Sequence, residues 1–195
     1  MIIYSKRPSF VFGFHGCEKT IRDQIVSNQI EMQPSNKNYD WLGHGYYFWE
    51  NNYRRAMLWA EDKQKRGGIT TPAVLGAFID LGHCLDLLDS HYLEALKETY
   101  KALETSYKLK GKPLPVNKST STSNDLLLRA LDCTVIQAHV TNSPPHITYD
   151  SVRGVFWEGN DLYPGAGMKE KNHIQICVRN INCIKGFFIP REQKA

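Results

Sequence analysis

The sequence lacks the features that would assign it to a membrane, to a disulfide-bonded secreted class or to a metal site. No run approaches the ~20 consecutive apolar residues that span a bilayer, and the first residues do not form the apolar core of a secretory signal. The five cysteines are odd in number and form neither a Cys-x-x-Cys pair nor a His/Cys cluster with zinc-ligand spacing. We therefore expect a cytoplasmic protein without membrane contact, disulfide framework or metal.

Strong charge is also absent, since the net charge of the 195-residue chain is +4. This mild positive bias tolerates an anionic ligand or partner but does not demand nucleic acid. Hydrophobic residues make up 42% and charged residues 23%, as in ordinary soluble globular proteins. Because the chain contains no internal repeat and no second hydrophobic unit, we expect one domain over residues 1–195.

Hydrophobic periodicity predicts an α+β fold with strands towards both ends of the chain. Strands are expected at residues 9–14, 46–49, 73–81, 84–88, 152–157, 174–178 and 183–189. Helices are expected at residues 18–27, after a cap at Asn51 or Asn52, after a cap at Asp89 or Ser90, and at 126–138. Residues 108–123 predict a loop, because they hold two prolines and a Ser/Thr run without periodicity. Since a helical insertion over about residues 89–140 separates the strands, the sheet should be mixed or antiparallel rather than doubly wound.

An aromatic stretch at residues 41–50 (WLGHGYYFWE) stands out from the rest of the chain. Gly43 and Gly45 permit a tight turn and the close approach of another group. Residues 46–49 then predict a short strand on which neighbouring aromatic side chains point to opposite faces. One face can join a core, and the other can leave a ring free to stack on a flat ligand. The alternative is a glycine-rich turn that leads into a wholly buried strand.

Four segments, taken in order, resemble the ADP-ribosyltransferase fold, in the His-Tyr-Glu branch typified by diphtheria toxin and the poly-ADP-ribose polymerases. Phe14-His15-Gly16 resembles the first strand motif of that branch, and residues 43–50 (GHGYYFWE) resemble its Gly-Lys-Gly-Ile-Tyr-Phe-Ala-Asp element. Residues 73–82 resemble the strand that follows there, and residues 173–188 resemble the closing strands. The resemblance implies split mixed or antiparallel sheets with flanking helices, and a single catalytic domain that uses NAD as its substrate.

The resemblance also implies roles for individual residues. Tyr47 stands at the functional tyrosine, whose ring stacks on nicotinamide, and the backbone amide and carbonyl of Gly16 are suited to its carboxamide. His15 is expected to donate a hydrogen bond to a ribose hydroxyl of the adenosine half and so to fix the pose of the cofactor. The second stacking ring is left open between Tyr46, Trp49 and Tyr53.

The helix after the aromatic stretch departs from the family pattern. Arg55 stands where the polymerases place a small hydroxyl residue, and Leu58 stands where they place the second stacking tyrosine. Arg54 or Arg55 could hold the pyrophosphate near a helix N-terminus, or both could be solvated surface arginines. No Gly-x-Gly-x-x-Gly follows a predicted strand, which argues against a Rossmann-type NAD site.

The third catalytic position is the largest departure. The ungapped comparison places Gln175 at the family's glutamate, and a register shifted by two residues would place His173 there instead. A glutamine can hydrogen-bond the nicotinamide ribose, but it cannot stabilise a developing cation with negative charge or deprotonate an acceptor. Glu158 and Glu170 are the nearby carboxylates, and Glu170, between two lysines, is better explained as surface charge.

We therefore predict an NAD-dependent mono-ADP-ribosyltransferase with His15, Tyr47 and Gln175 in the catalytic positions. Compact members of this fold often act as bacterial or phage toxins or defence effectors, so an antitoxin is a candidate partner. The acceptor is left open between protein and nucleic acid. The alternatives are an NAD- or ADP-ribose-binding module that transfers nothing, and an RNA 2′-phosphotransferase or NAD hydrolase on the same fold.

Overall fold

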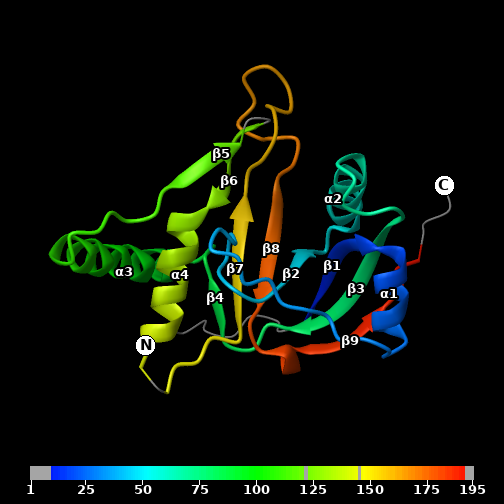
Figure 1. The fold of residues 1–195 in the computed structure, drawn as a ribbon, viewed down its shortest axis with the longest axis horizontal. Helices are drawn as coiled ribbons and strands as arrows, with labels where there is room; N and C mark the ends of the chain where they lie inside the picture. Colours follow the sequence, from blue (N-terminus) through cyan, green and yellow to red (C-terminus); the bar gives the residue numbers. More distant parts are fainter. Residues whose placement is uncertain (1–9, 121–122, 145, 192–195) are drawn as a thin grey trace.

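A computed structural model describes residues 10–120, 123–144 and 146–191, and within them the chain forms a mixed α+β fold (Figure 1). The strands are β1 (Phe10–Glu18), β2 (Tyr46–Glu50), β3 (Pro72–Asp80), β4 (Cys84–Asp86), β5 (Asn117–Thr120), β6 (Ser123–Arg129), β7 (Ser151–Phe156), β8 (His173–Val178) and β9 (Ile184–Phe188). The helices are α1 (Lys19–Val26), α2 (Tyr53–Lys65), α3 (Ser90–Leu109) and α4 (Ala130–Asn142), with a 3-10 turn at Ile181–Cys183.

One seven-stranded sheet organises the molecule, with the strand order β4-β7-β8-β2-β1-β3-β9. The pairing of β4 with β7 is parallel and the other pairings in this sheet are antiparallel, which confirms the predicted mixed sheet. Strand β1 pairs with β3 along its whole length, whereas its register with β2 covers Gly13 and Phe14. The sheet therefore consists of two halves, β4-β7-β8-β2 and β1-β3-β9, joined by a short contact.

The two halves pack together through a core that contains Phe48, Leu75, Ile79, Ile176 and Val178. A glycine is required at Gly13, because an added Cβ would lie 2.4 Å from Ile79 Cδ1 and 2.9 Å from Phe48 Cβ. Side chains on the other face of β2 and β8 enter separate clusters, one beside α4 and one beneath α2. The predicted alternation of β8 is confirmed, since Ile176 and Val178 lie in one cluster and Cys177 in another.

The insertion between β4 and β7 contains α3, the two-stranded β5–β6 hairpin and α4, and it lies on one side of the sheet (Figure 1). The predicted helix at 126–138 was wrong at its start, because residues 126–129 belong to β6 and the helix begins at Ala130. The predicted loop at 108–123 likewise contains β5. Consecutive leucines fit both the 3.6-residue period of a helix and the two-residue period of a strand. Here the pairing of Leu128 with Lys118 selects the strand.

Local signals predicted most of the other boundaries. The Asn52 side chain accepts from the Arg55 amide at 2.9 Å and caps α2, and Asp89 caps α3 through the amide of His91 at 3.0 Å. The first predicted strand began at Ser9, which lies outside the described residues. Strand β1 continues to Glu18, so His15 and Gly16 lie within it rather than at its end. No helix in the described ranges is long and apolar enough to cross a membrane.

Candidate functional site

The hydrogen-bond ladder between β1 and β2 stops beside His15, Gly16 and Tyr47, the residues to which the sequence resemblance gives a role. The amide of Asn51 donates to the carbonyl of Phe12 at 2.8 Å, and the strand pairing then extends to Phe14. Because bonded pairs alternate along an antiparallel ladder, the next bonded pair in this register would join Gly16 to Tyr47. The pairing between the described parts of these strands ends before that position. The amide and carbonyl of Gly16 are therefore directed towards β2 across an interrupted stretch of sheet.

The imidazole of His15 contacts β2 at this interruption. Its Nδ1 lies 2.8 Å from the carbonyl oxygen of Tyr47, and because a carbonyl can only accept, Nδ1 carries the proton. Burial lowers the pKa of His15, against the raising effect of the bond to Tyr47, and Lys63 lowers it further. The ring is therefore neutral at neutral pH, with Nε2 as an acceptor. This differs from the expected donor role, since neutral His15 in this tautomer can accept a bond from a ribose hydroxyl but cannot donate one.

Tyr47 closes the glycine turn that precedes β2. Its hydroxyl donates to the carbonyl of Gly43 at 2.6 Å and accepts from the amide of Leu42 at 2.8 Å. Gly43 has a φ of 78°, which a glycine adopts without strain. Burial raises the pKa of Tyr47, and its half-buried ring packs against the cluster that contains Leu42 and Cys177. The hydroxyl thus has a structural role, and stacking of the ring on nicotinamide stays a prediction.

Gln175 lies one strand further along the sheet, on β8. It is directly opposite Trp49 of β2, while Tyr47 is opposite Cys177. Residues opposite one another share a face of the sheet, so Tyr47, Trp49 and Gln175 point to the same side. The neighbour of Gln175 on β7 is Gly154, which has no side chain, and Gln175 is half-buried. The sheet thus brings His15, Tyr47 and Gln175 onto three adjacent strands, although 160 residues of sequence separate the first from the last.

Beside Gln175 lies a buried polar cluster that joins α2 to the ends of β7 and β8. Arg55 Nη2 forms an ion pair with Glu158 Oε2 at 2.8 Å, and the two side chains are 8% and 10% exposed. His173 Nδ1 donates to the Lys171 carbonyl at 2.7 Å and lies 3.5 Å from the same Glu158 oxygen. Burial lowers the pKa of His173, so its ring is neutral at neutral pH. Arg55 therefore compensates the charge of Glu158, one of the two carboxylates that could take the place of the family's glutamate.

Aromatic rings surround this cluster. The His173 ring stacks on Trp41 at 6.1 Å between centroids and lies 6.4 Å from Trp49. Arg55 Cζ lies 5.5 Å from the centre of the Trp49 ring. Among the described residues, His173 Nε2, Trp49 Nε1 and Arg55 Nε are buried polar atoms without a hydrogen-bond partner. The cluster is therefore polar and water-poor, a setting in which charges interact more strongly than in solvent.

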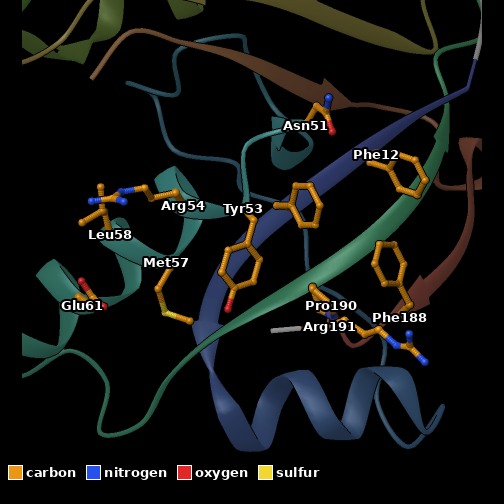
Figure 2. Close-up of a pocket in the computed structure, with 11 residues that line it drawn as sticks. Phe12, Asn51, Tyr53, Arg54, Met57, Leu58, Glu61, Phe188, Pro190 and Arg191 are labelled. Atoms are coloured by element: carbon orange, nitrogen blue, oxygen red, sulfur yellow. The ribbon is translucent and has the colours of Figure 1, made fainter. Parts of the chain in front are cut away.

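The remaining predicted residues are dispersed. Tyr46 packs on the core between the sheet halves, on the face opposite Tyr47, so of the candidate second rings Trp49 shares a face with Tyr47. Arg54 is exposed and Tyr53 is half-buried; both line a pocket of about 820 Å³ beside α2, shown in Figure 2. Glu170 is exposed, as expected for surface charge.

Comparison of the chain with protein-family models, with curated proteins and with solved structures finds no match in any of the three. No three His, Cys, Asp or Glu side chains gather as they would around a metal ion in the ranges that the structure describes.

Sequence reasoning missed the aromatic and cationic residues that arrive from distant elements. Trp59 of α2 lies 6.4 Å from the His15 ring and 5.9 Å from Trp49, between centroids. Arg129, at the start of α4, lies 4.4 Å from the centre of the Trp41 ring. Nothing in the local pattern around Trp59 indicates a contact with His15, and nothing around Arg129 indicates a contact with Trp41.

Proposed function

We propose that this chain is an NAD-dependent mono-ADP-ribosyltransferase, which releases nicotinamide as ADP-ribose passes to a macromolecular acceptor. The observation that carries the proposal is the interrupted β1–β2 ladder at Gly16 and Tyr47, with the His15 imidazole bonded across it. The proposal joins this geometry to the resemblance of residues 14–16 and 43–50 to that class of enzyme.

The interruption suits a primary amide. In a continued ladder the amide and carbonyl of Gly16 would exchange two hydrogen bonds with Tyr47. A nicotinamide carboxamide carries one acceptor and a donor group on the same carbon, so it can make the same two bonds to Gly16. A nicotinamide bound there would lie next to the strand that holds Tyr47 and Trp49, whose rings share a face. Binding by such a pair fixes the orientation of the ring that leaves.

The remaining groups position the sugar. Neutral His15 can accept a bond from a ribose hydroxyl through Nε2, and the Gln175 amide can bond the hydroxyl of the nicotinamide ribose. Gln175 has no charge to stabilise a developing cation, and the charge of Glu158 is compensated by Arg55. Positioning therefore has to supply most of the catalysis, which favours slow single transfers over elongation of a polymer.

The test is whether the purified protein releases nicotinamide from NAD. Release by the wild type and its strong loss in His15→Ala, with an unchanged circular dichroism spectrum, are the expected results. Incubation with labelled NAD and a cell extract should then leave label on protein or nucleic acid. Release without labelled macromolecule would replace the transferase with an NAD hydrolase, and absence of release would overturn both.

A second candidate function is an NAD- or ADP-ribose-binding module without transfer, which the pairing of Glu158 with Arg55 favours. Calorimetric binding of NAD without nicotinamide release would support it. In either case we place the protein in the cytoplasm, where NAD is present. By analogy with compact members of the fold we assign it to a toxin or defence system with an antitoxin partner. Growth arrest on expression that is lost in His15→Ala would support that role.

A further inference from the structure

A groove lies on the β9 side of α2, apart from the interrupted β1–β2 ladder at Gly16 and Tyr47. Its walls are formed by β1, the start of α2 and the end of β9, and it has a volume of about 820 Å³ (Figure 2). The lining residues are Phe12, Phe14, Asn51, Tyr53, Arg54, Met57, Leu58, Glu61, Phe188, Pro190 and Arg191.

The floor of the groove is aromatic and partly open to solvent. Phe12 is 47% exposed, and its ring meets that of Phe188 edge-on, with 6.1 Å between centroids. Phe14 meets Tyr53 in the same way at 6.0 Å. An edge-on contact covers one face of one of the two rings, and Phe78 also packs against Phe12 and Phe188. Because Phe12 nevertheless stays 47% exposed, the groove offers ring surface on which another planar group can stack.

Two arginines line the groove on opposite sides. Figure 2 shows the Arg54 side chain extending from α2 beyond Tyr53, and the Arg191 guanidinium beside Phe188 on the opposite side of the groove. Neither forms an ion pair with another residue of the described ranges. Glu61 is the single carboxylate in the lining, so the groove keeps a net positive charge.

We propose that this groove binds a short single-stranded segment of nucleic acid. Aromatic faces within a positively charged groove are what single-strand binding requires, because bases stack on the rings and phosphates meet the cations. Arg54 and Arg191 would contact phosphates on either side of bases stacked on Phe12 and Phe188. Asn51, at the rim, carries an amide that can bond a base edge. An apolar protein segment would gain from the rings but would leave both arginines unpaired.

The inference stands apart from the NAD chemistry, because binding is measured without NAD. The probe is a fluorescently labelled oligo-dT of about 12 nucleotides, within the ~4–16 nucleotides that single-strand binders cover, followed by anisotropy over a range of salt concentrations. We expect the logarithm of the binding constant to fall linearly with the logarithm of the salt concentration. Arg54→Gln with Arg191→Gln should reduce that slope by about 1.4, since each phosphate contact contributes about 0.7 for single strands. Phe12→Ala should weaken binding by about 5-fold to 100-fold at every salt concentration.

Matched controls keep the test specific. Lys112→Gln removes an exposed cation and Tyr163→Ala removes an exposed ring, both away from the groove, and neither should change binding. Failure of the folded protein to bind oligo-dT at low salt, or binding unaffected by all three groove substitutions, would overturn the proposal. A protein partner lost on Phe12→Ala, with no oligonucleotide binding, would assign the groove to protein instead. Nicotinamide release by Phe12→Ala, measured in parallel, separates failure here from failure of the proposed function.

Discussion

At the scale of single residues, the hydroxyl of Tyr47 forms hydrogen bonds that the sequence did not predict. The resemblance implies a role for the face of the Tyr47 ring, which Tyr47→Phe would keep. In the structure that hydroxyl bonds Gly43 and Leu42 and closes the turn that leads into β2. Tyr47→Phe should therefore lower the free energy of unfolding by about 1–3 kcal/mol, because the turn loses both bonds.

Urea denaturation measures this loss, with Tyr163→Phe as the control, since Tyr163 is 55% exposed. Tyr47→Ala should cost more, because its ring packs in the cluster with Leu42. If the ring stacks on nicotinamide, folded Tyr47→Phe should keep its affinity for NAD while Tyr47→Ala loses it. A Phe variant as stable as wild type would show that the two hydroxyl bonds contribute nothing.

The choice between Gln175 and Glu158 is the second question at this scale. Gln175→Ala should slow nicotinamide release by about 10²–10³-fold, the cost of one oriented donor, without a change in stability. Gln175→Glu should keep or raise release, because it restores a charge near the sugar. Glu158→Gln should instead lower the free energy of unfolding by about 3–5 kcal/mol, because it leaves Arg55 buried without a compensating charge.

Rates and urea unfolding, measured on the same variants, separate the two residues. Full activity in Gln175→Ala together with loss of activity in folded Glu158→Gln would contradict the assignment. The catalytic carboxylate would then come from the segment after β7, and the alignment of β8 with the family's closing strand would be wrong.

At the scale of elements, what the sequence predicted depended on whether the cause was local. Asn52 and Asp89 cap their helices through side chains two or three residues from the amides they bind, so a short window contains the whole signal. The alternation of β8 is likewise local. The β5–β6 hairpin could not be predicted, because β5 is polar, the three leucines of β6 fit a helix as well as a strand, and only pairing across the hairpin selects the strand.

The candidate site likewise contains features with a local cause and features with a tertiary cause. The motifs around His15 and Tyr47 can be recognised in the sequence because each is contiguous. The ion pair between Arg55 and Glu158 joins residues 103 positions apart. The sequence around Arg55 does not indicate a pairing with Glu158, nor the reverse. The interrupted ladder at Gly16 depends on how β2 diverges from β1, which is a tertiary property.

The junction of the two sheet halves gives a prediction at this scale. Gly13→Ala should be destabilising by about 1–3 kcal/mol, because its Cβ would enter the space of Ile79 and Phe48 at the short contact between the halves. Gly186→Ala is the matched control on β9, since a Cβ there meets nothing within 4 Å. Thermal unfolding compares the two. Equal melting temperatures for the two variants would mean that the sheet halves can move apart to accept the Gly13→Ala methyl group without a loss of stability.

At the scale of the whole molecule, the net charge is small and both halves of the sheet are tied together by buried contacts. A second buried ion network joins β2, β4 and β7, where Arg153 pairs with Glu50 at 2.5 and 2.9 Å and with Asp86 at 3.2 Å. The one positive charge of Arg153 is thus shared by two carboxylates. Burial also lowers the pKa values of His15, His139 and His173, whose unfolded value of 6.5 lies close to neutral pH.

These histidines predict how stability depends on pH. Each has a folded-state pKa below the unfolded value of 6.5, so the unfolded chain binds more protons between those two values. As far as these histidines are concerned, the free energy of unfolding should be nearly constant between about pH 7 and 7.5 and should fall as pH drops through 6.5 towards the lowered pKa values. Melting temperatures between about pH 7.5 and 5.5 measure this, in a window where most carboxylates stay ionised.

The variant that isolates the effect is His173→Phe. A phenyl ring fits among Trp41, Trp49 and Phe156, which lie 5.8–6.4 Å from the imidazole between centroids, and it cannot bind a proton. Nearby Glu158 raises the pKa of His173 and Arg55 lowers it, so burial remains the leading cause of the shift. The melting temperature of His173→Phe should fall less steeply with decreasing pH than that of the wild type, whatever its value at pH 7.5. An unchanged slope would mean that His173 binds its proton equally well in the folded and unfolded chain.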